Sequence, residues 1–178
     1  MRLAAFRYEE IKKSIVDFFE EQKICCTPIN GFEIATKIGA KIIPYSMFPE
    51  KELLEKVSKD GFSIKKGSQW YLYYNDAQSY ERINFTMMHE TGHIILDHTE
   101  ESEVAEAEAN FFAKFSLAPP VLIHKFDLRD PYEVADRFEI SLEAAFYAFN
   151  YYKKWLKYGE KAYKDYELKI CEMFGLAF

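Results

Sequence analysis

Residues 89–93 read His89-Glu90-Thr91-Gly92-His93, and this stretch decides how the 178-residue chain folds. Residues four apart on a helix share a face, so the two imidazoles point the same way and can bind one metal ion. Glu90 lies one position further round the helix, where its carboxylate can take a proton from water without being a metal ligand. This layout is typical of zinc-dependent hydrolases, in which the ion lowers the pKa of a bound water to about 7.

The residues on either side predict that this stretch lies on a half-buried helix. Phe85, Met88 and Ile95 fall near one stripe at helical spacing. Gly92 lies inside the helix, where glycine costs about 0.5–1 kcal/mol relative to alanine. A structural reason is therefore expected, such as the close approach of another backbone. The alternative is an ordinary helix with two surface histidines.

A catalytic zinc ion usually has three protein ligands, so a third is needed. Metzincins place a histidine six residues after His93, but that position is Thr99 and His98 comes one residue early. The next predicted helix, which runs to about residue 117, supplies carboxylates instead. Its apolar stripe favours Glu106, on the edge of the buried face, whereas Glu108 is expected to point largely away from that face.

Three neighbours are predicted to support this site. Glu103 shares a face with Glu106 one turn earlier and remains the alternative ligand. Asn110, one turn after Glu106, is expected to hydrogen-bond a metal ligand without binding the metal itself. His98 is assigned to the same supporting layer, or it simply ends its helix, where a histidine suits the helix dipole.

Two motifs in residues 89–119 resemble one known family. The first is His89-Glu90-x-x-His93-Ile-Ile-Leu-x-His98, and the second is Glu106-Ala-Glu108-Ala109-Asn110-Phe-Phe-Ala113, followed by Leu117 and Pro119. Together they resemble the ImmA/IrrE metallo-endopeptidases. The resemblance implies that His89, His93 and Glu106 hold Zn²⁺ and that Glu90 is the general base. The chain departs from the family's Leu-Leu-x-Pro ending at Ser116, which affects packing and no ligand.

The resemblance also implies a substrate. Members of this family typically cleave a helix-turn-helix repressor of a mobile element or a stress regulon. We therefore expect a zinc-dependent endopeptidase with such a repressor as its partner. The alternative is a protein that binds zinc and the regulator without cutting it, as an anti-repressor or a toxin–antitoxin component. The intact Glu90 argues against this alternative, because binding alone needs no general base.

The remaining patterns predict an α+β fold with a zincin-like core. A small β-sheet is expected to pack on the HExxH helix, with further helices at the C-terminus. Strands are predicted at residues 41–45, 62–64 and 69–74; two helices, at residues 8–22 and 31–39, precede the first strand, and a third, at residues 50–59, follows it. Residues 1–125 are expected to form the metallopeptidase domain, and residues 126–178 a helical extension packed on the same core.

The strand at residues 69–74 is expected to be an edge strand that pairs with an extended substrate. This interpretation assigns substrate binding to Tyr73 and Tyr74, and a plain core strand is the alternative. An oxyanion stabiliser is also expected, and Tyr73, Tyr74, His98 and His124 all remain candidates for it.

The C-terminal part predicts two successive helices. Asp130 caps a helix over residues 131–138, and Ser141 caps a second one that continues to about Tyr158. A helix-turn-helix motif would need Arg, Lys, Asn or Gln at the start of the second helix, which offers only Glu143. We interpret the pair as a packed helical hairpin. The net charge of −6 agrees that no direct binding of nucleic acid is expected.

Composition and the N-terminal residues indicate a cytoplasmic protein. No apolar run approaches the roughly 18 residues of a membrane span, and the first residues lack the apolar region of a signal peptide. Cys25 and Cys26 are adjacent and Cys171 is alone. We therefore expect free, reduced and mostly buried thiols without a structural metal site.

Overall fold

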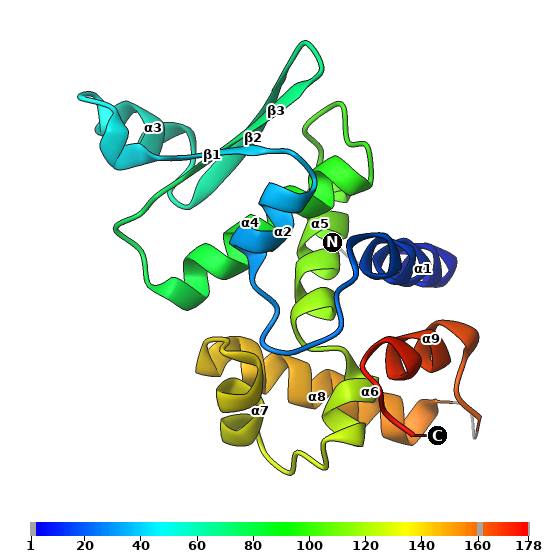
Figure 1. Ribbon diagram of the computed structural model, residues 1–178. Coiled ribbons are helices and arrows are strands. Elements are labelled where there is room, and N and C mark those ends of the chain that lie inside the picture. Colours follow the sequence, from blue (N-terminus) through cyan, green and yellow to red (C-terminus); the bar gives the residue numbers. More distant parts are fainter. Residues whose placement is uncertain (1–2, 160–161, 178) are drawn as a thin grey trace.

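The computed structural model describes residues 3–159 and 162–177 and has a mixed α+β fold, as predicted (Figure 1). The first half of the chain contains α1 (Ala5–Gln22), α2 (Gly31–Lys37), β1 (Lys41–Pro44), the 3₁₀ turn η1 (Tyr45–Met47), α3 (Lys51–Val57), β2 (Gly61–Lys66), β3 (Gln69–Tyr74) and α4 (Tyr80–Ile95). The second half contains α5 (Glu103–Leu117), α6 (Pro120–Lys125), α7 (Pro131–Phe138), α8 (Leu142–Tyr158) and α9 (Asp165–Met173).

The three strands form one sheet in the order β1-β3-β2. Strand β1 is parallel to β3, and β2 is antiparallel to it, so Tyr73 has Ile43 on one side and Phe62 on the other. The expectation that residues 69–74 form an edge strand is therefore wrong. The local pattern predicts a strand but not its neighbours, and β1 reaches β3 from almost thirty residues earlier. The outer strands are β1 and β2.

Helix α4 packs against the sheet and against α2. Leu72 and Met87 are fully buried between them, in a small apolar cluster with Ala35 and Ala40. The fully buried Asn84 of α4 also fixes the segment before α2. Its side-chain amide donates to the Ile29 carbonyl at 3.0 Å, and its side-chain oxygen accepts from the Gly31 N–H at 2.6 Å. These contacts set the position of the helix that carries residues 89–93.

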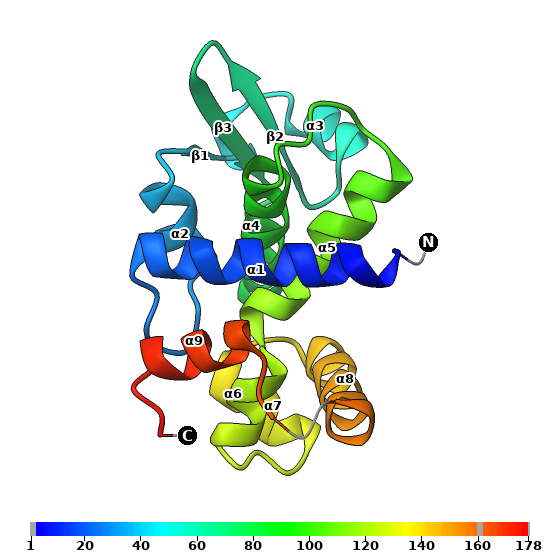
Figure 2. The ribbon, with the colours of Figure 1, turned by 90° about the vertical axis from the view of Figure 1, so that its right-hand side faces the viewer.

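The main apolar core lies between the remaining helices. Figure 2 shows α1 lying across α4 and α5, with α6 to α9 gathered below them. Fully buried side chains come from α1, α5, α6, α7 and α9, including Phe19, Phe112, Leu122, Phe138 and Ile170. One core thus extends across residue 125, where the boundary of the helical extension is predicted.

Helices α7 and α8 pack together as the predicted helical hairpin. The sequence patterns predict neither α6 nor α9. Helix α6 has only six residues, too few to show a period, and α9 begins after Lys164, which is not a residue type that caps helices. Within the described part of the chain, no helix combines the length and the apolar character that a bilayer crossing requires.

The cysteines are free, but only Cys171 is buried. Cys25 and Cys26 are exposed in the loop between α1 and α2, so the expectation of mostly buried thiols is wrong for this pair. The same loop buries Ile24 and Ile29 in the main core, so its apolar side chains are buried and the two thiols face solvent.

The contact of α2 with α4 leaves no room for a side chain at Gly31. A Cβ there would lie 2.6 Å from Met87 Cβ and 2.9 Å from the Asn84 carbonyl oxygen. We expect Gly31→Ala to lower the free energy of unfolding by about 1–3 kcal/mol in urea denaturation. Thr36→Ala, at an exposed position of the same helix, is the control and should change it by no more than about 0.5 kcal/mol. Equal effects of the two substitutions would show that α2 does not pack this closely.

Candidate active site

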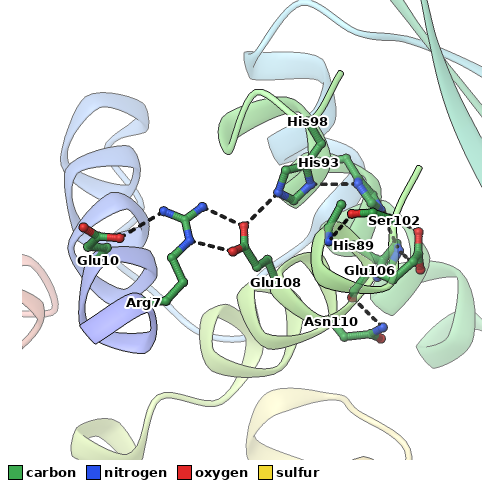
Figure 3. Close-up of polar contacts among 10 residues, drawn as sticks. Arg7, Glu10, His89, His93, His98, Ser102, Glu106, Glu108 and Asn110 are labelled. Carbon is green, nitrogen blue, oxygen red and sulfur yellow. Dashed lines mark hydrogen bonds and ion pairs between the residues drawn. The ribbon is translucent and has the colours of Figure 1, made fainter. Parts of the chain in front are cut away.

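The structure brings together three of the predicted site residues from two helices. His89 and His93 lie one turn apart on α4, and Glu106 lies on the first turns of α5 (Figure 3). The Nε2 atoms of the two histidines are 3.1 Å apart. The Glu106 carboxylate lies 3.4 Å from His89 Nε2 and 3.2 Å from His93 Nε2.

These distances fit one small metal ion. Ligand atoms bound at about 2.0–2.2 Å to a tetrahedral zinc lie about 3.3–3.6 Å from one another. The three observed separations, in which Oε2 of Glu106 faces His89 and Oε1 faces His93, lie within a few tenths of an ångström of this spacing. Of the described residues, only His89, His93 and Glu106 form such a group. Glu103, the alternative ligand, does not belong to it.

Both histidines are held in the neutral form that a metal ligand needs. Burial lowers the pKa of His89 to about 4, and the neighbouring His93 adds to this effect. Burial also lowers the pKa of His93, against the opposing charge of Glu106. At neutral pH each ring therefore has a nitrogen lone pair available for a cation.

Glu90 is buried beside this group, with 7% of its surface exposed. Its Oε2 accepts a hydrogen bond of 2.8 Å from the hydroxyl of Ser63 on β2. Burial raises the pKa of Glu90 to about 7; the bond from Ser63 opposes this rise, and the charge of Glu106 adds to it. A carboxyl group with a near-neutral pKa can both accept and return a proton. A bound cation would lower this pKa.

A chain of polar contacts leads from His93 to the N-terminal helix (Figure 3). His93 Nδ1 lies 2.9 Å from His98 Nδ1, and His98 Nε2 lies 3.0 Å from Glu108 Oε2. Arg7 of α1 then donates two hydrogen bonds of 2.6 Å to the two oxygens of Glu108. The Arg7 guanidinium holds the pKa of Glu108 below its usual range. A paired carboxylate thus orients His98, and His98 orients His93.

One prediction about this surrounding layer is wrong, and another holds only through a main-chain contact. Glu108 does not point away from the buried face: it is 5% exposed, because α1 packs over that side of α5 and brings in Arg7. Asn110 does not bond a metal ligand through that ligand's side chain. Its amide donates to the main-chain carbonyl of Glu106 at 2.8 Å, a bond within the helix.

Sequence reasoning missed Ser63, Arg7 and the burial of Glu108. Ser63 meets Glu90 only through the pairing of β2 in the sheet, and Arg7 is 101 positions from Glu108. The sequence contains one indication that Glu108 belongs to the site, because it is the second glutamate of the motif Glu106-Ala-Glu108-Ala109-Asn110.

Gly92 lies between the two histidines and faces α5. A Cβ at this position would come within 3.1 Å of the Phe112 side chain. The close approach that the glycine suggests therefore exists, but the neighbour is an aromatic ring rather than a backbone. It brings α5 near enough for Glu106 to reach the histidines.

The three donor residues and Glu90 line a cleft of about 1690 Å³. Ligand pockets for small molecules are typically about 300–1,000 Å³, so this cleft has room for a stretch of polymer. Residues 60–65, which include most of β2, form one side. Tyr73 and Tyr74 are not among the residues that line it, although Trp70 of the same strand is, so the assignment of substrate contacts to them stays a prediction. His124 also lies elsewhere, 3.1 Å from the Tyr152 hydroxyl.

The chain from Arg7 to His93 predicts an effect on metal affinity. We expect Glu108→Gln to weaken zinc binding by about 10–100-fold, because the substitution removes the charge that orients His98. Competition with a chromophoric chelator measures this affinity. Glu103→Gln removes an exposed carboxylate of the same helix and should leave the affinity unchanged. Wild-type affinity in both variants would show that the chain of contacts does not act on the metal site.

Burial of Glu90 predicts a pH-dependent stability of the metal-free protein. The pKa of Glu90 is about 7 in the folded chain, against 4.5 for the ordinary group. The folded state binds this proton more tightly, so its stabilising effect is lost as the pH rises through about 7. Relative to wild type, Glu90→Gln should therefore gain about 2–3 kcal/mol of unfolding free energy between about pH 5 and pH 8.

Urea denaturation of both metal-free proteins at the two pH values measures this difference. The low pKa of His89 acts in the opposite direction, but it is common to both proteins and cancels. A difference between the proteins that does not change with pH would contradict the raised pKa.

Comparison with known proteins places the chain in a family. The profile of the IrrE N-terminal-like domain, peptidase family M78, matches residues 35–150, well over half of the chain. The match includes α4, α5 and both motifs quoted above, whereas Arg7 lies outside it. A search of curated proteins found no match. With the peptidase motif on two packed helices and the family profile over most of its length, the chain belongs to the IrrE N-terminal-like domain family of peptidases.

Proposed function

We propose that this protein is a zinc-dependent endopeptidase. The observation that carries the proposal is the convergence of His89, His93 and Glu106 to separations of 3.1–3.4 Å, with Glu90 buried beside them. Membership of a peptidase family supports the reaction type. The cleft supports a polymeric substrate, because it is larger than small-molecule pockets usually are.

His89, His93 and Glu106 would hold Zn²⁺ at one side of the cleft. When bound, the ion supplies Lewis-acid chemistry, which acidifies water and polarises a peptide carbonyl. Glu90 accepts the proton of the attacking water and delivers it to the amine that leaves as the peptide bond breaks. Ser63 holds Oε2 of Glu90, so Oε1 is the oxygen available to the water. The main chain of β2 offers an outer strand edge with which an extended peptide can pair.

The proposed substrate is a helix-turn-helix repressor of a mobile element or a stress regulon, cut in the cytoplasm where such a repressor acts. The resemblance of the two motifs supports this choice. The protein is proposed to recognise the repressor rather than its DNA, since the first turn of α8 carries Glu143, which phosphates would repel. The buried Glu90 favours cleavage over the non-cutting anti-repressor or toxin–antitoxin role, because a binding protein gains nothing from burying a carboxyl group of raised pKa.

Substitution of the proposed general base tests the activity. Glu90→Gln should keep the zinc content of wild type, measured by elemental mass spectrometry, and lose turnover by at least about 100-fold. Intact-mass spectrometry of a helix-turn-helix repressor, incubated with each zinc-loaded protein, should show two fragments only with wild type. Cleavage at the wild-type rate by the variant would overturn the mechanism. An intact repressor that co-purifies with wild type would favour the binding role.

A further inference from the structure

The face of α5 that carries Glu106 continues along the cleft. Asn110 and Lys114 follow Glu106 at intervals of four residues, so all three lie on one side of the helix, and all three line the cleft. Eight residues of helix span about 12 Å. An extended peptide covers the same length with about three or four residues. Lys114 is thus within reach of a substrate side chain that lies a few residues from the cut bond.

Lys114 is half-buried among aromatic groups. Its Nζ lies 4.1 Å from the ring centroid of Tyr147 on α8, and Tyr8 and Phe111 line the same end of the cleft. Burial lowers the pKa of Lys114, while the charge of Glu143 opposes this effect. In the part of the chain that the structure describes, no carboxylate forms an ion pair with Lys114. A half-buried ammonium of this kind attracts an anion more strongly than a fully solvated one.

The charges along the cleft differ between its ends. Acidic residues gather where α5 begins: Asp97, Glu100, Glu101, Glu103 and Glu106. Of the described residues that line the cleft, only Lys65 and Lys114 are lysines, and none is an arginine. Lys65 lies over Trp70 beside the β2–β3 hairpin, away from α8. Among the described lining residues, Lys114 is therefore the one cation at the end formed by α5 and α8.

We propose that this end of the cleft is a binding subsite for a carboxylate, in which Lys114 pairs with an acidic side chain of the peptide substrate. The tyrosine hydroxyls of Tyr8 and Tyr147, at the same end, are further hydrogen-bond donors of the kind a carboxylate accepts. The subsite rests on the proposed peptidase function, and it sets which substrate segment fits the cleft. An acidic residue about three or four positions from the cut bond is favoured, and a basic one is rejected.

Peptide hydroxamates test the subsite, because the hydroxamate binds the zinc ion and fixes the register of the peptide. The probes are short alanine-based peptides with a hydroxamate at one end or the other, and with Glu, Gln or Lys at the third or fourth residue. Isothermal titration calorimetry measures their dissociation constants for the zinc-loaded wild type. With the hydroxamate at one of the two ends, and at one of the two tested positions, the Glu peptide should bind about five- to ten-fold more tightly than the Gln peptide.

Variants of Lys114 then show whether this residue causes the preference. Lys114→Gln should abolish the difference between the Glu and Gln peptides, Lys114→Glu should favour the Lys peptide, and Lys114→Arg should retain the preference for Glu. Lys154→Glu makes the same charge change at an exposed position of α8 outside the cleft and is the matched control. A ratio of Glu to Gln affinities that is the same in wild type and Lys114→Glu would overturn the subsite, whereas an absence of binding by every hydroxamate would contradict the zinc site on which it rests.

Binding and turnover separate this inference from the function on which it rests. A Glu preference that depends on Lys114, in a protein that cuts no peptide, would support the subsite and contradict the peptidase. Cleavage of peptides by a protein whose preference for Glu does not depend on Lys114 would support the peptidase and contradict the subsite.

Discussion

The site depends on the packing of α4 against α5, with Gly92 of one helix against the Phe112 ring of the other. The two histidines come from α4 and the carboxylate from α5, so no single element can supply the three donors. Bond lengths at a metal site vary by only about 0.2 Å, and helices move as rigid bodies. A small shift between these two helices would therefore separate the donors. The fully buried Asn84 and Gly31 fix α4 from its other side, and Arg7 fixes α5 through Glu108.

Much of the polar network around the donors is costly to bury. Glu90 is buried with one hydroxyl partner and near the charge of Glu106, and its pKa rises accordingly. Glu108 is equally buried, but two hydrogen bonds from Arg7 keep it ionised. The two carboxyl groups thus differ in protonation because their partners differ, which suits one to moving a proton and the other to holding a histidine in place.

The local parts of this arrangement could be predicted from the sequence. The spacing of His89 and His93 requires only helix geometry, and the apolar stripe of α5 placed Glu106 on the edge of the buried face by the same geometry. The parts that failed all depend on contacts distant in sequence. The order of the sheet depends on β1, the burial of Glu108 depends on Arg7, and the partner of Glu90 depends on the pairing of β2. No periodicity within one element reports such contacts.

The proposed function requires that His89, His93 and Glu106 together hold one catalytic zinc ion. The test is a crystal of the zinc-loaded protein, measured on both sides of the zinc absorption edge. One anomalous peak is expected, about 2.0–2.2 Å from Nε2 of both histidines and from the Glu106 carboxylate. A zinc peak at another set of residues, or none between these three in crystals with bound zinc, would contradict it.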